Sequence, residues 1–245
     1  MVREPVGHAR AGPRPVTTDP LRQMFASAEA VLFDFDGPVC SVFDGYPAQY
    51  VTAELRELAD AIPHDLDQAL RKATGPHDLL LAAADDPQLA ARLERALQDA
   101  ELKAVESALP TPGAADSLSA CQRSGKLVAI VSNNYAAAVV RYLARTGLAD
   151  RVAHVEGRDP SDPTLMKPSP HLIENATRAL GVRTAACVFI GDQTSDIAAG
   201  RTAGARTIGY ANKPGKADAL ALAGADLVVG AMAEVAMAID RGRAV

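Results

Sequence analysis

The stretch AVLFDFDG at residues 30–37 sets the fold, because it is a short apolar run that ends in two aspartates and a glycine. Residues 30–33 carry no polar side chain, which is typical of a strand that is buried on both faces of a parallel sheet. Asp34 and Asp36 would point the same way if the strand continued, and Gly37 lets the chain turn away. Taken alone, the same residues also suit a solvated turn.

Five further stretches have the same strand-like character, at residues 127–132, 152–157, 187–192, 205–210 and 226–230. Helical patterns alternate with them near residues 112–124, 135–146, 169–180, 194–203 and 231–241. A glycine follows each of the first four helices, namely Gly125, Gly147, Gly181 and Gly204. This alternation predicts an α/β fold in which a Rossmann-like parallel sheet is covered by helices on both faces.

The gap between the first two strands is too long for a simple crossover. Residues 45–109 show only helical patterns, and a crossover between parallel strands needs far fewer residues. We therefore expect a small all-helical domain to be inserted after the first strand. The main domain would then comprise residues 21–44 and 110–245, and the proline-rich residues 1–20 are predicted to be a disordered tail.

Composition narrows the classes of partner. The chain has 245 residues, of which 48% are hydrophobic, and a formal net charge of −5, which argues against nucleic acid as a partner. No stretch is long and apolar enough for a membrane span or a signal peptide, so we expect a cytoplasmic protein that does not bind membranes. Cys40, Cys121 and Cys187 are widely spaced and are expected to be reduced thiols. Whether the protein is a monomer or a homodimer is left open.

Further polar residues follow the predicted strands. Ser132 and Asn133 stand where a helix begins, so a hydroxyl and backbone amides there can hold phosphate oxygens, although helix caps use the same residues. Lys167 lies in a proline-flanked loop and can neutralise a carboxylate and a phosphoryl oxygen, although a lone lysine is usually a solvated charge. Asp192 ends a strand, and Asp196 lies one helical turn later, where it can support Asp192. All of these segments should meet at the edge where open parallel sheets bind ligands.

With its motifs in this order, the chain resembles a hydrolase of the haloacid dehalogenase superfamily over about residues 30–230. The residues that match the four family motifs are, in order, Asp34, Asp36, Ser132, Lys167, Asp192 and Asp196. The predicted helical insertion resembles the C1-type cap of the phosphoglycolate phosphatase and β-phosphoglucomutase-like members. Pro38 departs from the family pattern, which usually has threonine at this place in the turn.

The resemblance implies a Mg²⁺-dependent phosphatase that hydrolyses a small phosphorylated metabolite through an aspartyl-phosphate. Asp34 would be the nucleophile, and Asp36 the general acid and base. The implied metal-binding residues are Asp34, Asp36 through its backbone carbonyl, and Asp192, with Asp196 in support. The implied phosphate-binding residues are Ser132, Asn133 and Lys167.

Three other functions are compatible with these residues. A dehalogenase of the superfamily attacks carbon and needs neither the second aspartate nor a metal, so Asp36 counts against it. A phosphomutase uses the same four motifs. A noncatalytic protein would bind phosphate without turnover, and the complete set of acids counts against that function. Four residues of the insertion could reach a substrate but are assigned no role, because such side chains usually lie on helix surfaces: Tyr46, Arg71, His77 and Arg92. The identity of the phosphate ester is left open.

Overall fold

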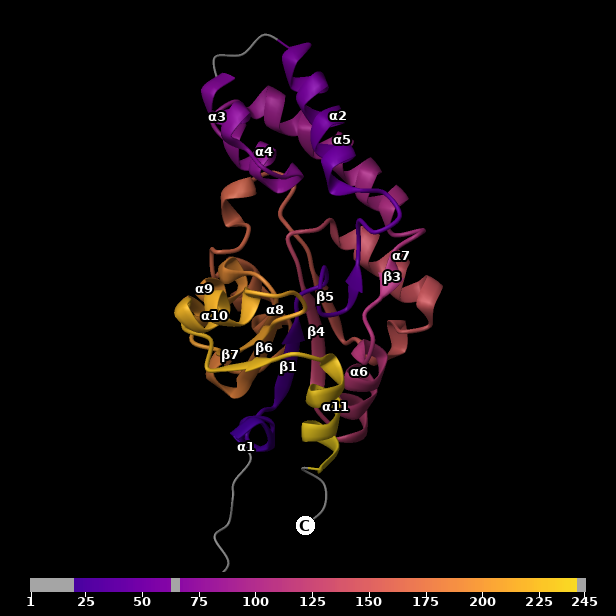
Figure 1. Ribbon diagram of the computed structural model, residues 1–245, viewed down its shortest axis with the longest axis vertical. Helices are drawn as coiled ribbons and strands as arrows, with labels where there is room; N and C mark the ends of the chain where they lie inside the picture. Colours follow the sequence, from indigo (N-terminus) through magenta and orange to yellow (C-terminus); the bar gives the residue numbers. More distant parts are fainter. Residues whose placement is uncertain (1–19, 63–66, 242–245) are drawn as a thin grey trace, which may run out of the picture.

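The computed structural model describes residues 20–62 and 67–241, and within them a six-stranded sheet forms the centre of the molecule (Figure 1). Its strands lie in the order β5-β4-β1-β6-β7-β8, and every neighbouring pair is parallel. The bounds are β1 (Ala30–Phe33), β4 (Leu127–Val131), β5 (His154–Glu156), β6 (Cys187–Gly191), β7 (Arg206–Tyr210) and β8 (Leu227–Val229). The predicted strands and the α/β fold are confirmed, with each strand slightly shorter than expected.

The order of the strands determines where a ligand can bind. The sheet begins with the central β1, continues outward through β4 and β5, and then resumes on the other side of β1 with β6, β7 and β8. Ala30 of β1 is in register with Leu127 on one side and Cys187 on the other. The carboxyl ends of β1, β4 and β6 are therefore neighbours at the point where the direction of winding reverses, which is the usual ligand-binding edge of such a sheet.

Helices cover both faces because side chains of β1 alternate between two apolar clusters. Val31 and Phe33 belong to a cluster with residues of α6, α7 and α11, whereas Ala30 and Leu32 belong to a second cluster with α8 and α9. The helices around the sheet are α1 (Pro20–Ala26), α6 (Ala114–Arg123), α7 (Ala136–Thr146), α8 (His171–Leu180), α9 (Thr194–Ala203), α10 (Lys216–Leu222) and α11 (Met232–Arg241). Single 3₁₀ turns lie at η1 (Ala149–Arg151), η2 (Pro163–Leu165) and η3 (Thr184–Ala186). The four predicted helix-ending glycines all have positive φ, but α1 and α10 were not predicted.

The helical insertion forms a third apolar cluster. Its helices are α2 (Ala48–Asp60), α3 (Asp67–Lys72), α4 (Pro76–Ala82) and α5 (Pro87–Ala104), and they stand above the carboxyl end of the sheet (Figure 1). Leu55, Leu79 and Leu93 are buried in this cluster, together with Met166 from the loop before α8. The chain enters and leaves the insertion through a small antiparallel pair, β2 (Cys40–Ser41) and β3 (Leu109–Pro110). The division at residues 45 and 109 remains a prediction, which this separate core supports.

Three smaller expectations concern the N-terminal tail, the cysteines and membrane-spanning helices. The predicted tail lies outside the described residues except for Pro20, which begins α1. Cys40, Cys121 and Cys187 are free and buried. Over the part of the chain that the structure describes, none of the helices has both the length and the apolar character needed to cross a membrane.

Candidate active site

The structure gathers the predicted site residues from separate strand ends. Asp34 follows β1 directly, Ser132 follows β4 and Asp192 follows β6, and these three strands are neighbours. Lys167 reaches the same place from the loop before α8, and its Nζ lies 2.7 Å from Asp34 Oδ1 and 2.7 Å from Asp196 Oδ1. Asp34 and Lys167, which are 133 positions apart in the chain, are thus bonded to each other in a buried site.

Asp34, Asp192 and Asp196 form an acid cluster. All three are buried, and one carboxylate oxygen from each lies within 4.8 Å of the others. Asp192 Oδ1 is a buried oxygen with no hydrogen-bond partner among the described residues, while Asp192 Oδ2 pairs with Lys216 from the start of α10. A buried, unpartnered carboxylate oxygen beside other carboxylates is the environment that a hard, oxygen-seeking cation stabilises. The acid cluster therefore fits a divalent metal ion.

Two glycines make room for this cluster. Gly37 has a φ of 114°, and a Cβ placed on it would lie 2.5 Å from Cγ of Asp192. A Cβ on Gly191 would clash with the side chain of Asp196. Asp196 can therefore turn back toward the strand end, where its Oδ2 accepts hydrogen bonds from the backbone amides of Asp192 (3.0 Å) and Gln193 (2.9 Å). These bonds hold the loop that carries Asp192.

Burial and mutual repulsion shift the titration of the site. Burial, reinforced by the charge of Asp196, raises the pKa of Asp34 well above its ordinary value despite the bond from Lys167. Burial also raises the pKa of Asp192, although Lys216 pairs with it. For Lys167, burial lowers the pKa, but the nearby carboxylates of Asp196 and Asp34 outweigh that effect and raise it overall. Lys167 therefore stays a cation beside Asp34, whose ionisation burial opposes.

Asp36 has a separate environment. Its Oδ1 accepts a hydrogen bond from the amide of Val42 at 2.9 Å, and the residue lines the same cavity as Asp34. Burial raises the pKa of Asp36, and the bond from Val42 only partly offsets this shift. Asp36 is thus suited to carry a proton at a pH where an exposed aspartate would not.

The loop after β4 is held by its own side chains. Ser132 Oγ donates to Asn134 Oδ1 at 3.0 Å and accepts from the amide of Asn134 at 3.1 Å. Asn133 Oδ1 accepts from the amide of Lys167 at 2.8 Å, and its Nδ2 donates to the carbonyl of Lys167 at 3.2 Å. The side chain of Asn133 therefore clamps the loop that carries Lys167. This contact was not predicted from the sequence. The role of Asn133 in phosphate binding remains a prediction.

A cavity of about 380 Å³ lies over these residues, between the strand ends and α4. Asp34, Asp36 and Lys167 line it from the sheet, and His77 and Leu81 line it from the insertion. Of the other insertion residues that could have reached a substrate, Arg71 and Arg92 are exposed, and the hydroxyl of Tyr46 donates to Glu54.

The pair between Lys216 and Asp192 was not predicted from the sequence. Nothing near Lys216 in the sequence indicates that α10 packs toward Asp192.

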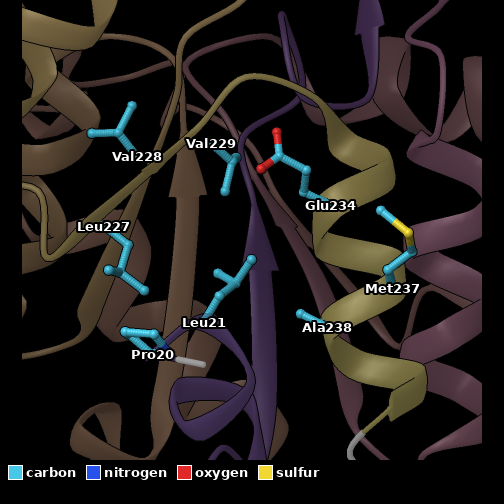
Figure 2. Close-up of a pocket in the computed structure, with 8 residues that line it drawn as sticks. All are labelled: Pro20, Leu21, Leu227, Val228, Val229, Glu234, Met237 and Ala238. Atoms are coloured by element: carbon cyan, nitrogen blue, oxygen red, sulfur yellow. The ribbon is translucent and has the colours of Figure 1, made fainter. Parts of the chain in front are cut away.

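A second hollow, of about 330 Å³, lies between α1, β8 and α11 (Figure 2). Its walls are apolar apart from Glu234, whose Oε1 accepts hydrogen bonds from the backbone amides of Gly230 and Ala231. This carboxylate is thus engaged in holding the start of α11. None of the predicted site residues lines the hollow, so the candidate site is the cavity at the carboxyl end of the sheet.

Comparison with known proteins finds a hydrolase family and relatives that are named phosphatases. The family model for haloacid dehalogenase-like hydrolases matches residues 28–204. The chain is 27% identical to N-acetylmuramic acid 6-phosphate phosphatase of Pseudomonas aeruginosa, over 87% of this chain and 95% of that protein. It is 28% identical to phosphoglycolate phosphatase of Rhodospirillum rubrum, over 76% and 82% of the two chains. The fold is similar to that of a predicted phosphatase from Clostridium acetobutylicum, with a TM-score of 0.69, 19% identity and coverage of 86% and 98%.

Proposed function

The chain belongs to the haloacid dehalogenase-like hydrolase family and is a phosphoric monoester hydrolase, and from this we propose that it is a Mg²⁺-dependent phosphatase of a small phosphorylated metabolite. We propose further that the reaction passes through an aspartyl-phosphate on Asp34. The observation that carries the proposal is the position of Asp34, buried at the end of the central strand, bonded to Lys167 and close enough to Asp192 to share one ion.

Mg²⁺ would be held by Asp34, the backbone carbonyl of Asp36, and Asp192. Asp192 Oδ1, which has no partner in the part of the chain that the structure describes, and the closely spaced acids support this assignment, since Mg²⁺ prefers oxygen ligands. A bound Mg²⁺ supplies positive charge that offsets the repulsion between the carboxylate of Asp34 and a phosphate. Asp196 would hold the loop of Asp192 in place through its two bonds to backbone amides.

The chain's own residues then carry out two steps. A carboxylate oxygen of Asp34 bonds to phosphorus as the bond to the leaving oxygen breaks, and Asp36 gives its proton to that oxygen. Asp36 next takes a proton from the water that attacks phosphorus, and the bond between Asp34 and phosphorus breaks. The raised pKa of Asp36 supports a protonated starting state.

Lys167, Ser132 and the backbone amide of Asn133 would hold the nonreacting phosphate oxygens. Each fixed donor in a site without bulk water is worth about 3 kcal/mol of transition-state stabilisation. We propose that residues 45–109 form a cap that excludes this water. Its separate core, and the residues of α4 that line the cavity, support that role.

The site and the relatives support one substrate class. A cavity of about 380 Å³ suits a compact metabolite, and the two relatives are named for N-acetylmuramic acid 6-phosphate and for phosphoglycolate. We therefore propose a phosphorylated sugar or small carboxylic acid as the substrate. A panel of such esters, assayed for phosphate release with Mg²⁺, would identify it.

The test of the proposed function uses p-nitrophenyl phosphate as a generic ester. We expect Asp34→Asn to abolish Mg²⁺-dependent release of phosphate, and Asp36→Ala to lower turnover by roughly 10²-fold or more. Asp116→Asn, which alters an exposed acid of α6, is the control and should behave as wild type. Full activity in Asp34→Asn, or wild-type activity that persists in EDTA, would overturn the proposal.

A further inference from the structure

A buried carboxylate from the insertion meets the phosphate-binding loop. Glu101, on α5, is completely buried. Its carboxylate accepts hydrogen bonds from Asn134 Nδ2 (2.9 Å) and from the amide of Tyr135 (2.9 Å), both in the segment that follows β4. Nη1 of Arg158 also donates to both of its oxygens, at 2.7 and 2.9 Å. An acid of the helical insertion is therefore bound to the loop that carries Ser132.

Asn134 passes this contact on to Ser132. Because a carboxylate only accepts hydrogen bonds, the side-chain amide of Asn134 must turn its Nδ2 toward Glu101 and its Oδ1 toward Ser132. The hydroxyl of Ser132 then donates to Oδ1 and accepts from the backbone amide of Asn134. All three residues are at most 2% exposed, so water has little access to replace these bonds. Glu101 thereby fixes the position of Ser132 Oγ without touching it.

The same carboxylate holds a side chain over the cavity. His77 of α4 lines the cavity, and its Nε2 lies 3.2 Å from Glu101 Oε1. Arg158 extends the connection, since its Nη1 donates to the carbonyl of Asn133 (3.0 Å) and its Nε to Glu94 (2.8 Å). Glu101 thus links the cavity-facing part of the insertion to the loop at the end of β4.

We infer that Glu101 is a positioning residue for catalysis, which acts through Asn134 to hold Ser132 in place and so ties the seating of the insertion to the phosphate-binding loop. This inference rests on the proposed phosphatase function. If the carboxylate is lost, the amide of Asn134 can rotate, and Ser132 Oγ is no longer held in place by both of its contacts with Asn134. A donor contributes most when its heavy atom is already in place, so that on phosphate binding only the proton of Ser132 has to turn from Asn134 Oδ1.

Glu94 provides a matched control. It lies on the same helix, is also buried, and accepts from the same arginine, but among the described residues its hydrogen bonds do not include Asn134 or Tyr135. Glu94→Gln and Glu101→Gln therefore both remove one buried charge beside Arg158. Only Glu101→Gln weakens the contact with the loop of Ser132.

The experiment compares these variants by melting temperature, by steady-state kinetics with p-nitrophenyl phosphate and Mg²⁺, and by the inhibition constant of inorganic phosphate. We expect both variants to melt below wild type. Only Glu101→Gln should lower kcat/KM, by roughly 10- to 100-fold, and raise the inhibition constant of phosphate. Equal kinetics in the two variants would overturn the inference.

Asn134→Ala tests the connection without disturbing the buried charges. It should lower kcat/KM like Glu101→Gln, and the double variant should lose little more than either single variant, because both act on one chain of contacts. Fully additive losses would overturn the inference. If wild type releases no phosphate from the ester, the proposed function itself fails and the inference with it. If wild type is active and Glu101→Gln equals it, only the inference fails.

Discussion

Two buried ionic groups in this protein differ in how their charges are satisfied. One is the acid cluster of Asp34, Asp192 and Asp196 at the sheet edge, and the other is an arginine bridge of Glu94, Glu101 and Arg158 between α5 and the loops of the sheet. Both groups are removed from water. Burial raises the pKa of Asp34 and Asp192 in the first. In the second, burial also opposes the charge of Glu101, but the bond from His77 and the charge of Arg158 prevail and lower its pKa.

This contrast shows that burial by itself does not make an acid either a structural or a reactive group. Glu101 has donors for both carboxylate oxygens, so its charge contributes to holding the insertion on the sheet. Asp192 keeps one buried oxygen without a donor among the described residues, so its charge is costly until a cation binds. Buried acids whose pKa values are shifted in this way are typical of functional sites.

The strongest effect should come from breaking the arginine bridge. Arg158→Met leaves Glu94 and Glu101 buried without their cation and should lower the free energy of unfolding by about 3–5 kcal/mol, as measured by urea denaturation. Arg141→Met is the control, since Arg141 pairs with Glu106 at an exposed position and its loss should cost less than about 1 kcal/mol. Equal losses would show that the bridge acts as no more than a surface ion pair.

A change of opposite sign is expected in the acid cluster. Without metal, Asp34→Asn removes one of several repelling charges, while Lys167 keeps Asp196 as its partner. The melting temperature in EDTA should rise by about 2–4 °C, which corresponds to roughly 1 kcal/mol for a chain of this size. Glu101→Gln, measured alongside, should melt below wild type. A lower melting temperature for Asp34→Asn would mean that its charge stabilises the fold, and the contrast would disappear.

The pH dependence of stability separates the two groups further. The pKa of Glu101 lies below its ordinary value of 4.5 in the folded protein, so its ionised form contributes stability above that value. This contribution is lost as the pH falls below 4.5 toward the folded pKa, with His77, Arg158 and Glu94 facing the group. Melting temperatures between neutral pH and about pH 3.5 should therefore fall more steeply for wild type than for Glu101→Gln. Parallel curves would contradict the lowered pKa.

The weakest effect concerns Lys216, the cation that pairs with Asp192. Lys216→Ala removes a competitor for Asp192 Oδ2 and should tighten Mg²⁺ binding by up to about fivefold, as measured by calorimetry. Lys213→Ala removes a charge from the same segment without removing the pair with Asp192, and its effect should be smaller. Weaker Mg²⁺ binding in Lys216→Ala would show that the lysine supports the site.

Most of the fold followed from patterns that are local in the chain. The apolar run at residues 30–33 predicts a strand buried on both faces, and Val31 and Leu32 lie in clusters on opposite faces of the sheet. The elements that escaped prediction, such as α10 (Lys216–Leu222) and the pair β2–β3, are short and lack a clear period, so only their contacts with the rest of the molecule define them.

The ends of the strands could be located from the amino-acid sequence, because an apolar run followed by acids or glycine depends only on neighbours in the chain. The motifs at these ends and in the loops between them therefore identified Asp34, Lys167 and Asp192 as candidate site residues. Two connections emerged only from the tertiary packing: Asn133 clamps the loop of Lys167, and Glu101 supports the loop of Ser132 through Asn134. Glu101 and Asn134 are 33 residues apart on different elements, and no period or motif encodes a hydrogen bond that exists only once those elements pack.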